Sequence, residues 1–309
     1  MIEHIPARPG LSPRRWLARR MARKAGRTSL SPNQPAEVQR ARMDKAGDAL
    51  PTASGVEVSR IEYAGRPALR FVPEGARDGV LLFLHGGGYS RGSAQSHKPF
   101  VSNLSRALRL EAVSLDYRLA PEHPCPAAID DALAAYRTLR SDTQGPILMA
   151  GDSAGGGLAL ATTLRLKADG DRLPDALYLL SPWVDLTMSG ESARTKDGID
   201  PMLKTSYLHK GAELYLHGAD GQSPDASPLF ADLSGLPPTY IQVGSDEILL
   251  DDSVRLAEKL AEAGVAVKCE IWEKLWHDFQ LFAPLLPEAY KAIKRVPDWA
   301  APYLSSQAD

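Results

Sequence analysis

Short apolar runs typical of β-strands alternate along most of this chain with longer segments of helical periodicity. From about residue 56 onward, eight such runs are candidate strands. They span Val56–Tyr63, Ala68–Val72, Val80–Leu84, Ala112–Leu115, Ile147–Ala150, Ala176–Leu180, Thr239–Val243 and Val265–Trp272. Helical patterns follow at Ser96–Arg109, Ala127–Arg140, Gly156–Lys167, Asp251–Ala263 and Pro287–Lys294. The alternation predicts an α/β fold with an eight-stranded, mostly parallel sheet and helices on both faces.

The link between the first two strands, residues 64–67, is too short for a crossover connection. We therefore expect these two strands to pair antiparallel as a hairpin and the remaining strands to be parallel.

Two segments interrupt the alternation and predict a helical cap over the carboxyl ends of the strands. Residues 1–50 look helical at Trp16–Lys24 and Ala36–Leu50, and residues 185–228 contain a helical pattern at Thr205–Leu216. The expected organisation is an N-terminal part of the cap at 1–50, core at 51–184, a cap insertion at 185–228, and core again at 229–309.

Composition places the chain among ordinary globular proteins. Its 309 residues are 44% hydrophobic and 24% charged, with a formal charge of -2, so nucleic acid is not an expected partner. The longest apolar runs are far too short to cross a bilayer, so no stable membrane insertion is expected. Two distant cysteines, Cys125 and Cys269, fit a reducing, cytoplasmic compartment. The histidines and cysteines show no metal-ligand spacing, so we expect no metal site.

The first 27 residues break the charge balance, with eight Lys or Arg against Glu3. Residues 12–17, Ser-Pro-Arg-Arg-Trp-Leu, are similar to a twin-arginine export signal, but no apolar region follows and export is rejected. A basic amphipathic helix is expected instead, with Trp16, Leu17 and Met21 turned toward the body. Use of this helix by a peripheral membrane lipase is a weaker alternative.

Residues 151–155 read Gly-Asp-Ser-Ala-Gly between a predicted strand and a predicted helix. A sharp strand-to-helix turn strains the serine and presents its hydroxyl, and close packing of the turn demands glycine on either side. In isolation the pattern can be an ordinary glycine-rich turn, but its placement favours a catalytic nucleophile at Ser153.

A second glycine-rich segment, residues 85–89, reads His-Gly-Gly-Gly-Tyr directly after a predicted strand. Successive glycines bring backbone N–H groups close to a substrate oxygen, which predicts an oxyanion hole. Gly86 and Gly87 are the expected donors, and the Ala154 N–H completes the set. A phosphate loop is the competing interpretation, but no Lys-Ser/Thr follows and no dinucleotide pattern is in place.

A nucleophile of this kind needs an acid and then a histidine later in the chain. Asp246 follows one predicted strand and His277 the next, so both should lie at the same sheet edge as Ser153. Glu247 stays open as a competing acid, whereas Asp251 and Asp252 are better explained as helix caps. The remaining histidines considered either lie in the cap helix or are expected to serve structure or solvent contact: His4, His97, His123, His209 and His217.

With these pieces assembled, the chain resembles the hormone-sensitive-lipase-like esterases, or bacterial family IV esterases, in the Gly-Asp-Ser-Ala-Gly subgroup of the α/β-hydrolase fold. The resemblance covers roughly residues 50–285. It rests on residues 85–88 with 92–93, 116–122, 151–156 and 181–183, and on the segments of the acid and the histidine, all in the family's order.

The resemblance implies hydrolysis of short- to medium-chain acyl esters without a cofactor, through an acyl-enzyme intermediate and beneath a two-part cap. It places nucleophile, acid and base at Ser153, Asp246 and His277. The oxyanion donors then fall on Gly86, Gly87 and Ala154. The segment 116–122 is expected to be structural, with Arg118 paired to a carboxylate and Pro121 ending a turn.

Substrate contacts are less constrained by the sequence. Tyr89, Trp183, Tyr207 and Leu214 could wall an apolar pocket or could equally belong to the core. The expected partner is a small-molecule ester, and a homodimer stays open. Lactones, carbamates and amides use the same machinery, so hydrolysis of these compounds is an alternative activity. A non-catalytic ligand-binding receptor of the same fold is a further alternative.

Overall fold

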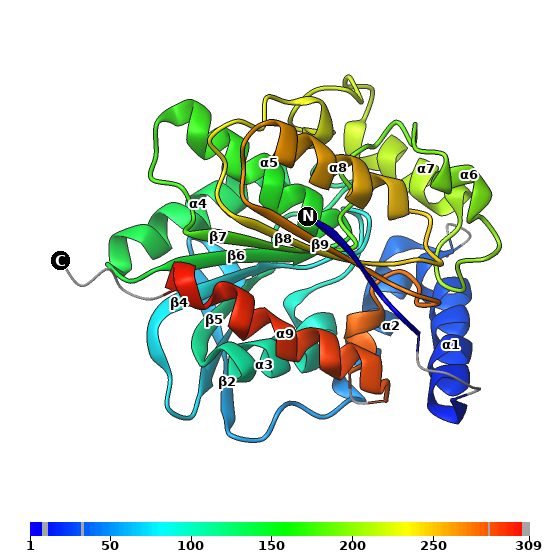
Figure 1. The fold of residues 1–309 in the computed structure, drawn as a ribbon, viewed down its shortest axis with the longest axis horizontal. Helices are drawn as coiled ribbons and strands as arrows, with labels where there is room; N and C mark the ends of the chain where they lie inside the picture. The colour runs from blue at the N-terminus through cyan, green and yellow to red at the C-terminus, as the bar shows by residue number, and fades with distance from the viewer. Residues whose placement is uncertain (8–11, 32–33, 284, 305–309) are drawn as a thin grey trace.

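The computed structural model describes residues 1–7, 12–31, 34–283 and 285–304. Over these ranges the chain forms a nine-stranded sheet in the order β1-β9-β8-β7-β6-β4-β5-β3-β2, with helices on both faces (Figure 1). The predicted α/β fold class, a mostly parallel sheet with helices on both faces, is confirmed.

All eight predicted strands are present. They are β2 (Val56–Tyr63), β3 (Arg66–Pro73), β4 (Arg77–Leu84), β5 (Leu110–Leu115), β6 (Ile147–Asp152), β7 (Ala176–Leu180), β8 (Thr239–Gly244) and β9 (Val267–Trp272). As expected, β2 and β3 form an antiparallel hairpin. Strand β3 also runs antiparallel to β5, and the pairs from β5 through β4, β6, β7 and β8 to β9 are parallel.

A ninth strand, β1 (Ile2–Ile5), lies at the edge of the sheet beside β9. The two strands are parallel, with Ile2 opposite Cys269 and Ile5 opposite Trp272. The expectation that residues 1–50 all belong to the cap, and that the sheet has eight strands, is therefore wrong at this short segment. Because β1 pairs with residues more than 260 positions away, its own neighbours in the sequence carry no sign of the pairing.

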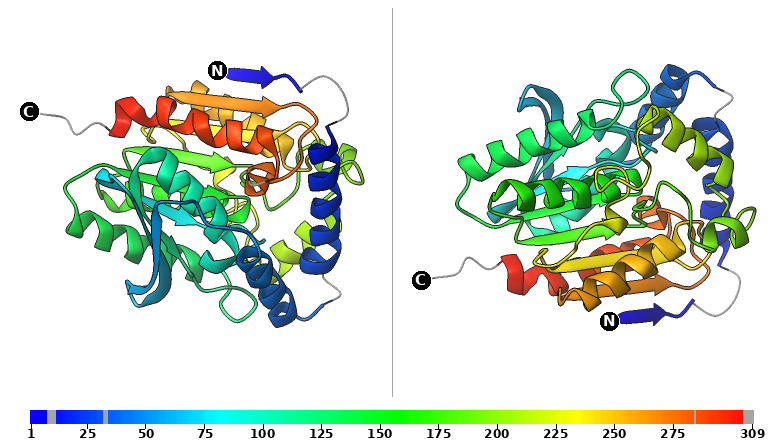
Figure 2. Two further views of the ribbon diagram at one scale, coloured as in Figure 1. Left: turned by 90° about the horizontal axis from the view of Figure 1, so that it is seen from below. Right: turned by 90° about the horizontal axis from the view of Figure 1, so that it is seen from above.

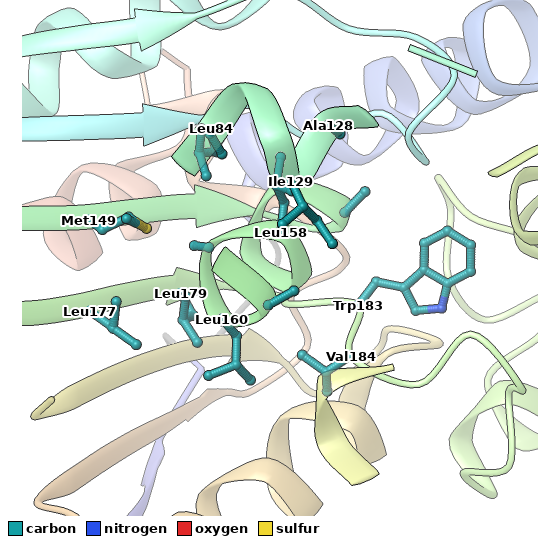
Figure 3. Close-up of a cluster of buried hydrophobic side chains, with 14 of the residues drawn as sticks. Leu84, Ala128, Ile129, Met149, Leu158, Leu160, Leu177, Leu179, Trp183 and Val184 are labelled. Carbon is teal, nitrogen blue, oxygen red and sulfur yellow. The ribbon is translucent and has the colours of Figure 1, made fainter. Parts of the chain in front are cut away.

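The helices form two layers around the sheet. One face packs against α3 (Ala94–Leu108) and α9 (Pro287–Leu304), and the other against α4 (Ala127–Asp142), α5 (Ala154–Asp169) and α8 (Leu250–Glu262). Figure 3 shows part of the second layer, where Leu158 of α5 and Ile129 of α4 lie near Leu84. These apolar layers hold the strand ends in fixed positions, and the site is built on those ends.

The predicted cap is made of short helical segments at the carboxyl ends of the strands (Figure 2). Its N-terminal part contains α1 (Pro13–Ala25), the π-helical turn η1 (Gly26–Leu30) and α2 (Ala36–Asp48). The insertion contributes α6 (Ser192–Thr195), α7 (Thr205–Leu216) and the 3₁₀ turn η2 (Pro228–Phe230), and a further turn, η3 (Phe279–Phe282), follows β9.

Helix α1 is oriented differently from the prediction. Trp16, Leu17 and Met21 are 61%, 45% and 38% exposed, whereas the helix buries Ala18 and Ala22. The small alanines face the body, flanked by two arginines with carboxylate partners: Arg15 Nη2 lies 2.6 Å from Glu288 Oε1, and Arg19 Nη1 lies 3.0 Å from Asp246 Oδ2. The expectation that the large apolar residues turn inward is therefore wrong. Among the helices in the described ranges, none is both long and apolar enough to span a membrane.

Candidate active site

Ser153 occupies the turn between β6 and α5, as the Gly-Asp-Ser-Ala-Gly pattern predicts. Its backbone has φ 52° and ψ −121°, an unfavourable conformation for a residue with a side chain. The turn is so tight that a Cβ atom on Gly155 would lie 2.6 Å from the carbonyl oxygen of His85. Hydrogen bonds fix the turn, because the Ser153 N–H donates to the Leu180 carbonyl at 2.8 Å. The hydroxyl is thereby presented at the edge of the sheet.

His277 lies against Ser153, in the loop that follows β9. Its Nε2 is 3.0 Å from Ser153 Oγ, and its Nδ1 is 2.9 Å from Glu247 Oε2. Because a carboxylate only accepts, the Nδ1–H is the donor to Glu247, which leaves Nε2 facing the serine hydroxyl in the neutral imidazole. Serine, histidine and glutamate therefore form one hydrogen-bonded chain with its members almost fully buried.

The carboxylate beside His277 belongs to Glu247, so the prediction that Asp246 orients the histidine is wrong. The Asp246 side chain turns the other way and accepts from Arg19 of α1. Glu247 is held in place by Ser181, whose Oγ donates to its Oε1 at 2.9 Å, and by the Gly244 N–H. The two acids are adjacent in one loop after β8, and only the turn of that loop decides which one faces the imidazole.

A second carboxylate also contacts the histidine. Asp278 Oδ2 lies 2.9 Å from His277 Nε2, and this side chain is buried in the wall of the cleft. Burial raises the pKa of Asp278 to about 7, an effect that the nearby imidazole opposes. Burial by itself would lower the pKa of His277, but the adjacent Asp278 and Glu247 carboxylates raise it well above its ordinary value. Nothing in the sequence pattern signalled Asp278.

The glycine-rich loop after β4 lies opposite Ser153, with Gly86, Gly87 and Gly88 lining the same cleft. The Gly86 N–H donates to Asp152 Oδ1 at 2.9 Å and is therefore already engaged. The prediction of Gly86 as an oxyanion donor is wrong for that reason. Within the described part of the chain, the N–H groups of Gly87, Gly88 and Ala154 have no acceptor.

The same Asp152 that holds Gly86 is supported by α3. Its Oδ2 lies 3.1 Å from His97 Nε2, and both side chains are buried. Burial opposes both charges, yet their mutual attraction raises the pKa of His97 and lowers that of Asp152. His85 adds a stacked contact with Tyr117 at 4.2 Å between ring centroids. These contacts hold in place the loop whose Gly87 and Gly88 line the cleft, and His97 has the structural role expected for it.

An apolar cleft opens onto Ser153 and His277 from beneath the cap. Both parts of the cap supply its walls, and Leu281 of η3 closes one side. The other apolar side chains that line it are Leu30, Met43, Met202, Leu203, Tyr207 and Leu208. Such a lining suits an apolar group attached to a polar reacting centre.

Of the four residues predicted to contact substrate, the structure places Tyr207 in the cleft. Tyr89 and Trp183 are instead core residues, at most 1% exposed. Tyr89 stacks on Tyr215 with 3.8 Å between ring centroids. Leu214 packs against the same core and does not line the cleft. The predictions for Tyr89, Trp183 and Leu214 are therefore wrong, because their aromatic or branched side chains hold the cap to the core.

The segment 116–122 has the structural contacts expected of it. Arg118 Nη2 lies 2.8 Å from Asp131 Oδ1. Asp116 Oδ1 accepts from the Ala94 N–H at 2.6 Å, at the start of α3. The segment thus ties α3 and α4 together beside the glycine-rich loop.

Comparison with known proteins shows which family this chain resembles. A family model described as alpha/beta hydrolase fold matches residues 81–281. An acetyl-hydrolase of Streptomyces hygroscopicus is 41% identical over 265 residues, which is 85% of this chain and 88% of that protein. An esterase of Acinetobacter venetianus is 36% identical over 281 residues, covering 90% and 91%. The crystal structure of an esterase from the bacterial hormone-sensitive lipase family has a TM-score of 0.91 and 39% identity, covering 96% of this chain and 100% of that one.

Proposed function

This chain belongs to the hormone-sensitive-lipase-like esterases of the α/β-hydrolase fold, and we propose that it hydrolyses carboxylic esters with Ser153 as nucleophile. His277 acts as the general base and Glu247 as the acid that orients it. The observation that carries the proposal is the continuous chain of contacts from Glu247 Oε2 through both ring nitrogens of His277 to Ser153 Oγ, at 2.9 and 3.0 Å.

The reaction begins when His277 Nε2 takes the proton of Ser153 as the serine oxygen attacks the ester carbonyl. Glu247 holds the Nδ1–H and stabilises the imidazolium that forms. The carbonyl oxygen becomes negative as the new bond forms, and the N–H groups of Gly87, Gly88 and Ala154 are its donors. His277 then protonates the departing alcohol, leaving an acyl group on Ser153.

Water then hydrolyses the acyl-enzyme, and His277 again acts as the base. His277 Nε2 removes a proton from the water, the resulting oxygen attacks the acyl carbonyl, and the carboxylic acid leaves as the proton returns to Ser153. No cofactor takes part in this sequence. Every proton transfer passes through His277 Nε2, which lies 3.0 Å from Ser153 Oγ.

Short- to medium-chain acyl esters are the proposed substrates. The apolar walls from Leu30, Met43 and Tyr207 support an aliphatic group beside the reacting carbonyl. The relative from Streptomyces hygroscopicus is named an acetyl-hydrolase, which favours the short end of this range. Because the attacking chemistry is shared, lactones, carbamates and amides belong in the same assay.

The test is hydrolysis of p-nitrophenyl esters of increasing acyl length by the wild type and by Ser153→Ala. We expect measurable turnover by the wild type and a loss of kcat of about 10⁵-fold or more in the variant. Circular dichroism of Ser153→Ala should match the wild type, since the change removes one oxygen. Retained hydrolysis by a folded Ser153→Ala protein would refute the assignment.

We also propose a cytoplasmic location, supported by two cysteines, Cys125 and Cys269, that carry free thiols. Burial raises the pKa of Cys269 to about 12, which keeps that thiol unreactive. Subcellular fractionation of cells expressing the chain tests this placement.

A further inference from the structure

Helix α1 presents to solvent a face that combines large apolar side chains with positive charge. Trp16, Leu17 and Met21 are all exposed, and the helix has no acidic residue in its first turn. Exposure of three large apolar side chains on one short helix is unusual for a surface with no partner. Packing against the body does not explain them, because the buried side of α1 is formed by its alanines.

The cations of this face are unpaired. Whereas Arg15 and Arg19 contact carboxylates, five further basic side chains in the same stretch have no acidic partner among the described residues. These five are Arg14, Arg20, Arg23, Lys24 and Arg27. The guanidinium of Arg20 lies 5.6 Å above the Trp16 ring. The charge of the face is therefore available to an anionic partner.

These side chains border one hollow in the surface. Its lining consists of Trp16, Arg19, Arg20, Arg23, Lys24, Arg27 and Thr28, with no carboxylate among them. Of the four arginines in this lining, only Arg19 has a carboxylate partner within the described ranges. A hollow with cationic walls and an aromatic rim fits an anionic head group whose attached chains lie against apolar side chains.

The position of this face relative to the cleft is also specific. A second groove runs from Arg23 and Arg27 to Met202, Leu203 and Tyr207. Those last three residues also line the cleft at Ser153. A partner seated on α1 would therefore lie beside the cap residues that enclose the catalytic serine.

We propose that the outer face of α1 and the adjoining turn η1, formed by Trp16, Leu17, Met21 and the five unpaired cations, docks the protein on the surface of an anionic lipid bilayer. Charge complementarity selects the anionic surface, and the exposed tryptophan and aliphatic side chains select a bilayer over a soluble anion. Docking of this kind is peripheral and leaves the helix at the interface. The proposal does not depend on the catalytic assignment.

Binding is measured with the full-length Ser153→Ala protein, so that vesicle lipids are not hydrolysed. The protein is sedimented with vesicles of phosphatidylcholine alone or mixed with phosphatidylserine, at low and high salt. We expect at least about tenfold tighter binding to the anionic vesicles, and loss of that preference as salt screens the charges. Equal binding to both vesicles, or to neither, would overturn the proposal.

Two double variants of the Ser153→Ala protein separate the contribution of charge to vesicle binding from that of apolar contact. Arg20→Glu/Lys24→Glu should lower the affinity for anionic vesicles about tenfold or more, because two attractive charges become repulsive. Trp16→Ser/Leu17→Ser should weaken binding at high salt most, where apolar contacts dominate. Lys291→Glu/Lys294→Glu on the exposed side of α9 makes the same change in net charge and should bind as the parent does.

Three results would contradict the assignment of this face. They are an equal loss of binding in the α9 variant, retained binding in the α1 charge variant, and self-association of the parent abolished by Trp16→Ser/Leu17→Ser without vesicles. In an otherwise wild-type chain, Arg20→Glu/Lys24→Glu should hydrolyse a water-soluble ester at the normal rate. That readout keeps a failure of docking distinct from a failure of the proposed catalysis.

Discussion

Glu247 and His277 are joined by a 2.9 Å contact between Oε2 and Nδ1, and both side chains are almost completely buried. The contact fixes one tautomer of the imidazole, so that Nε2 is left to accept from Ser153. Glu247 itself is positioned by Ser181 and by the backbone of its own loop. The geometry of the base is thus set by a residue that never touches substrate.

Replacing Glu247 by Gln should lower kcat by about 10²–10⁴-fold, because an amide can hold the wrong tautomer and cannot stabilise the imidazolium. Steady-state hydrolysis of a short p-nitrophenyl ester measures the effect. Asp246→Asn is the matched control, since it changes the adjacent carboxyl, and kcat should change less than about threefold because only the partly exposed pair with Arg19 is lost. The reverse order of effects would return the acid role to Asp246.

Asp278 is expected to set the pH at which the enzyme becomes active. The base must be neutral to accept a proton, and its pKa is raised by the nearby Asp278 and Glu247 carboxylates. Asp278→Asn removes one of these negative charges, so the pKa of His277 falls and the acid limb of kcat/KM should move to lower pH. The two groups titrate as a pair, so the apparent value belongs to both. An unmoved acid limb, or one displaced to higher pH, would contradict the role given to Asp278.

Gly87 is expected to be essential for stabilising the oxyanion. Its φ is 125°, and a Cβ atom there would lie 2.6 Å from the carbonyl carbon of Arg91. Gly87→Ala should displace the loop and lower kcat by about 10²–10³-fold, the cost of losing one donor. Gly170→Ala is the control, because that glycine also has a positive φ, 73°, but has open space around it. Similar kcat values for the two variants would contradict the role of the Gly87 loop in stabilising the oxyanion.

Tyr207 and Leu214 lie on the same cap helix, yet only Tyr207 lines the cleft. Tyr207→Ala should enlarge the cleft and change the ratio of kcat/KM between longer and shorter acyl esters by about tenfold. Leu214→Ala should leave that ratio unchanged and instead lower the free energy of unfolding, by about 1–3 kcal/mol for a half-buried side chain. Chain-length profiles and urea unfolding of the two variants check both expectations. Equal effects of the two variants on chain-length specificity would contradict the assignment of Tyr207, and not Leu214, to the substrate cleft.

The fold was largely predictable from the sequence because its signals are local. Strand periodicity, the short link at residues 64–67 and the glycines around Ser153 each act within a few residues. Strand β1 was missed because it depends on a distant edge of the sheet, beside β9. The orientation of α1 was also missed. There, close packing favours Ala18 and Ala22 on the buried side over larger apolar residues.

The sequence was enough to predict which loops meet at the site. It was not enough to predict which of two or three neighbouring residues in a loop faces the site. Asp246 and Glu247 share a loop, and Gly86, Gly87 and Gly88 share another. In the glycine-rich loop, Asp152 determines which N–H groups are available, because its carboxylate accepts from the Gly86 N–H. Over the part of the chain that the structure describes, the N–H groups of Gly87 and Gly88 are left free. Such choices depend on contacts between loops and leave no trace in spacing or composition.

The most direct measurement of the central claim is the site and rate of reaction with a fluorophosphonate, which modifies only an activated serine. Peptide mass spectrometry of the wild type should place the adduct on Ser153, and His277→Ala should slow labelling by several orders of magnitude because the base is lost. An adduct on another residue, or an unlabelled wild type that still hydrolyses esters, would contradict the account.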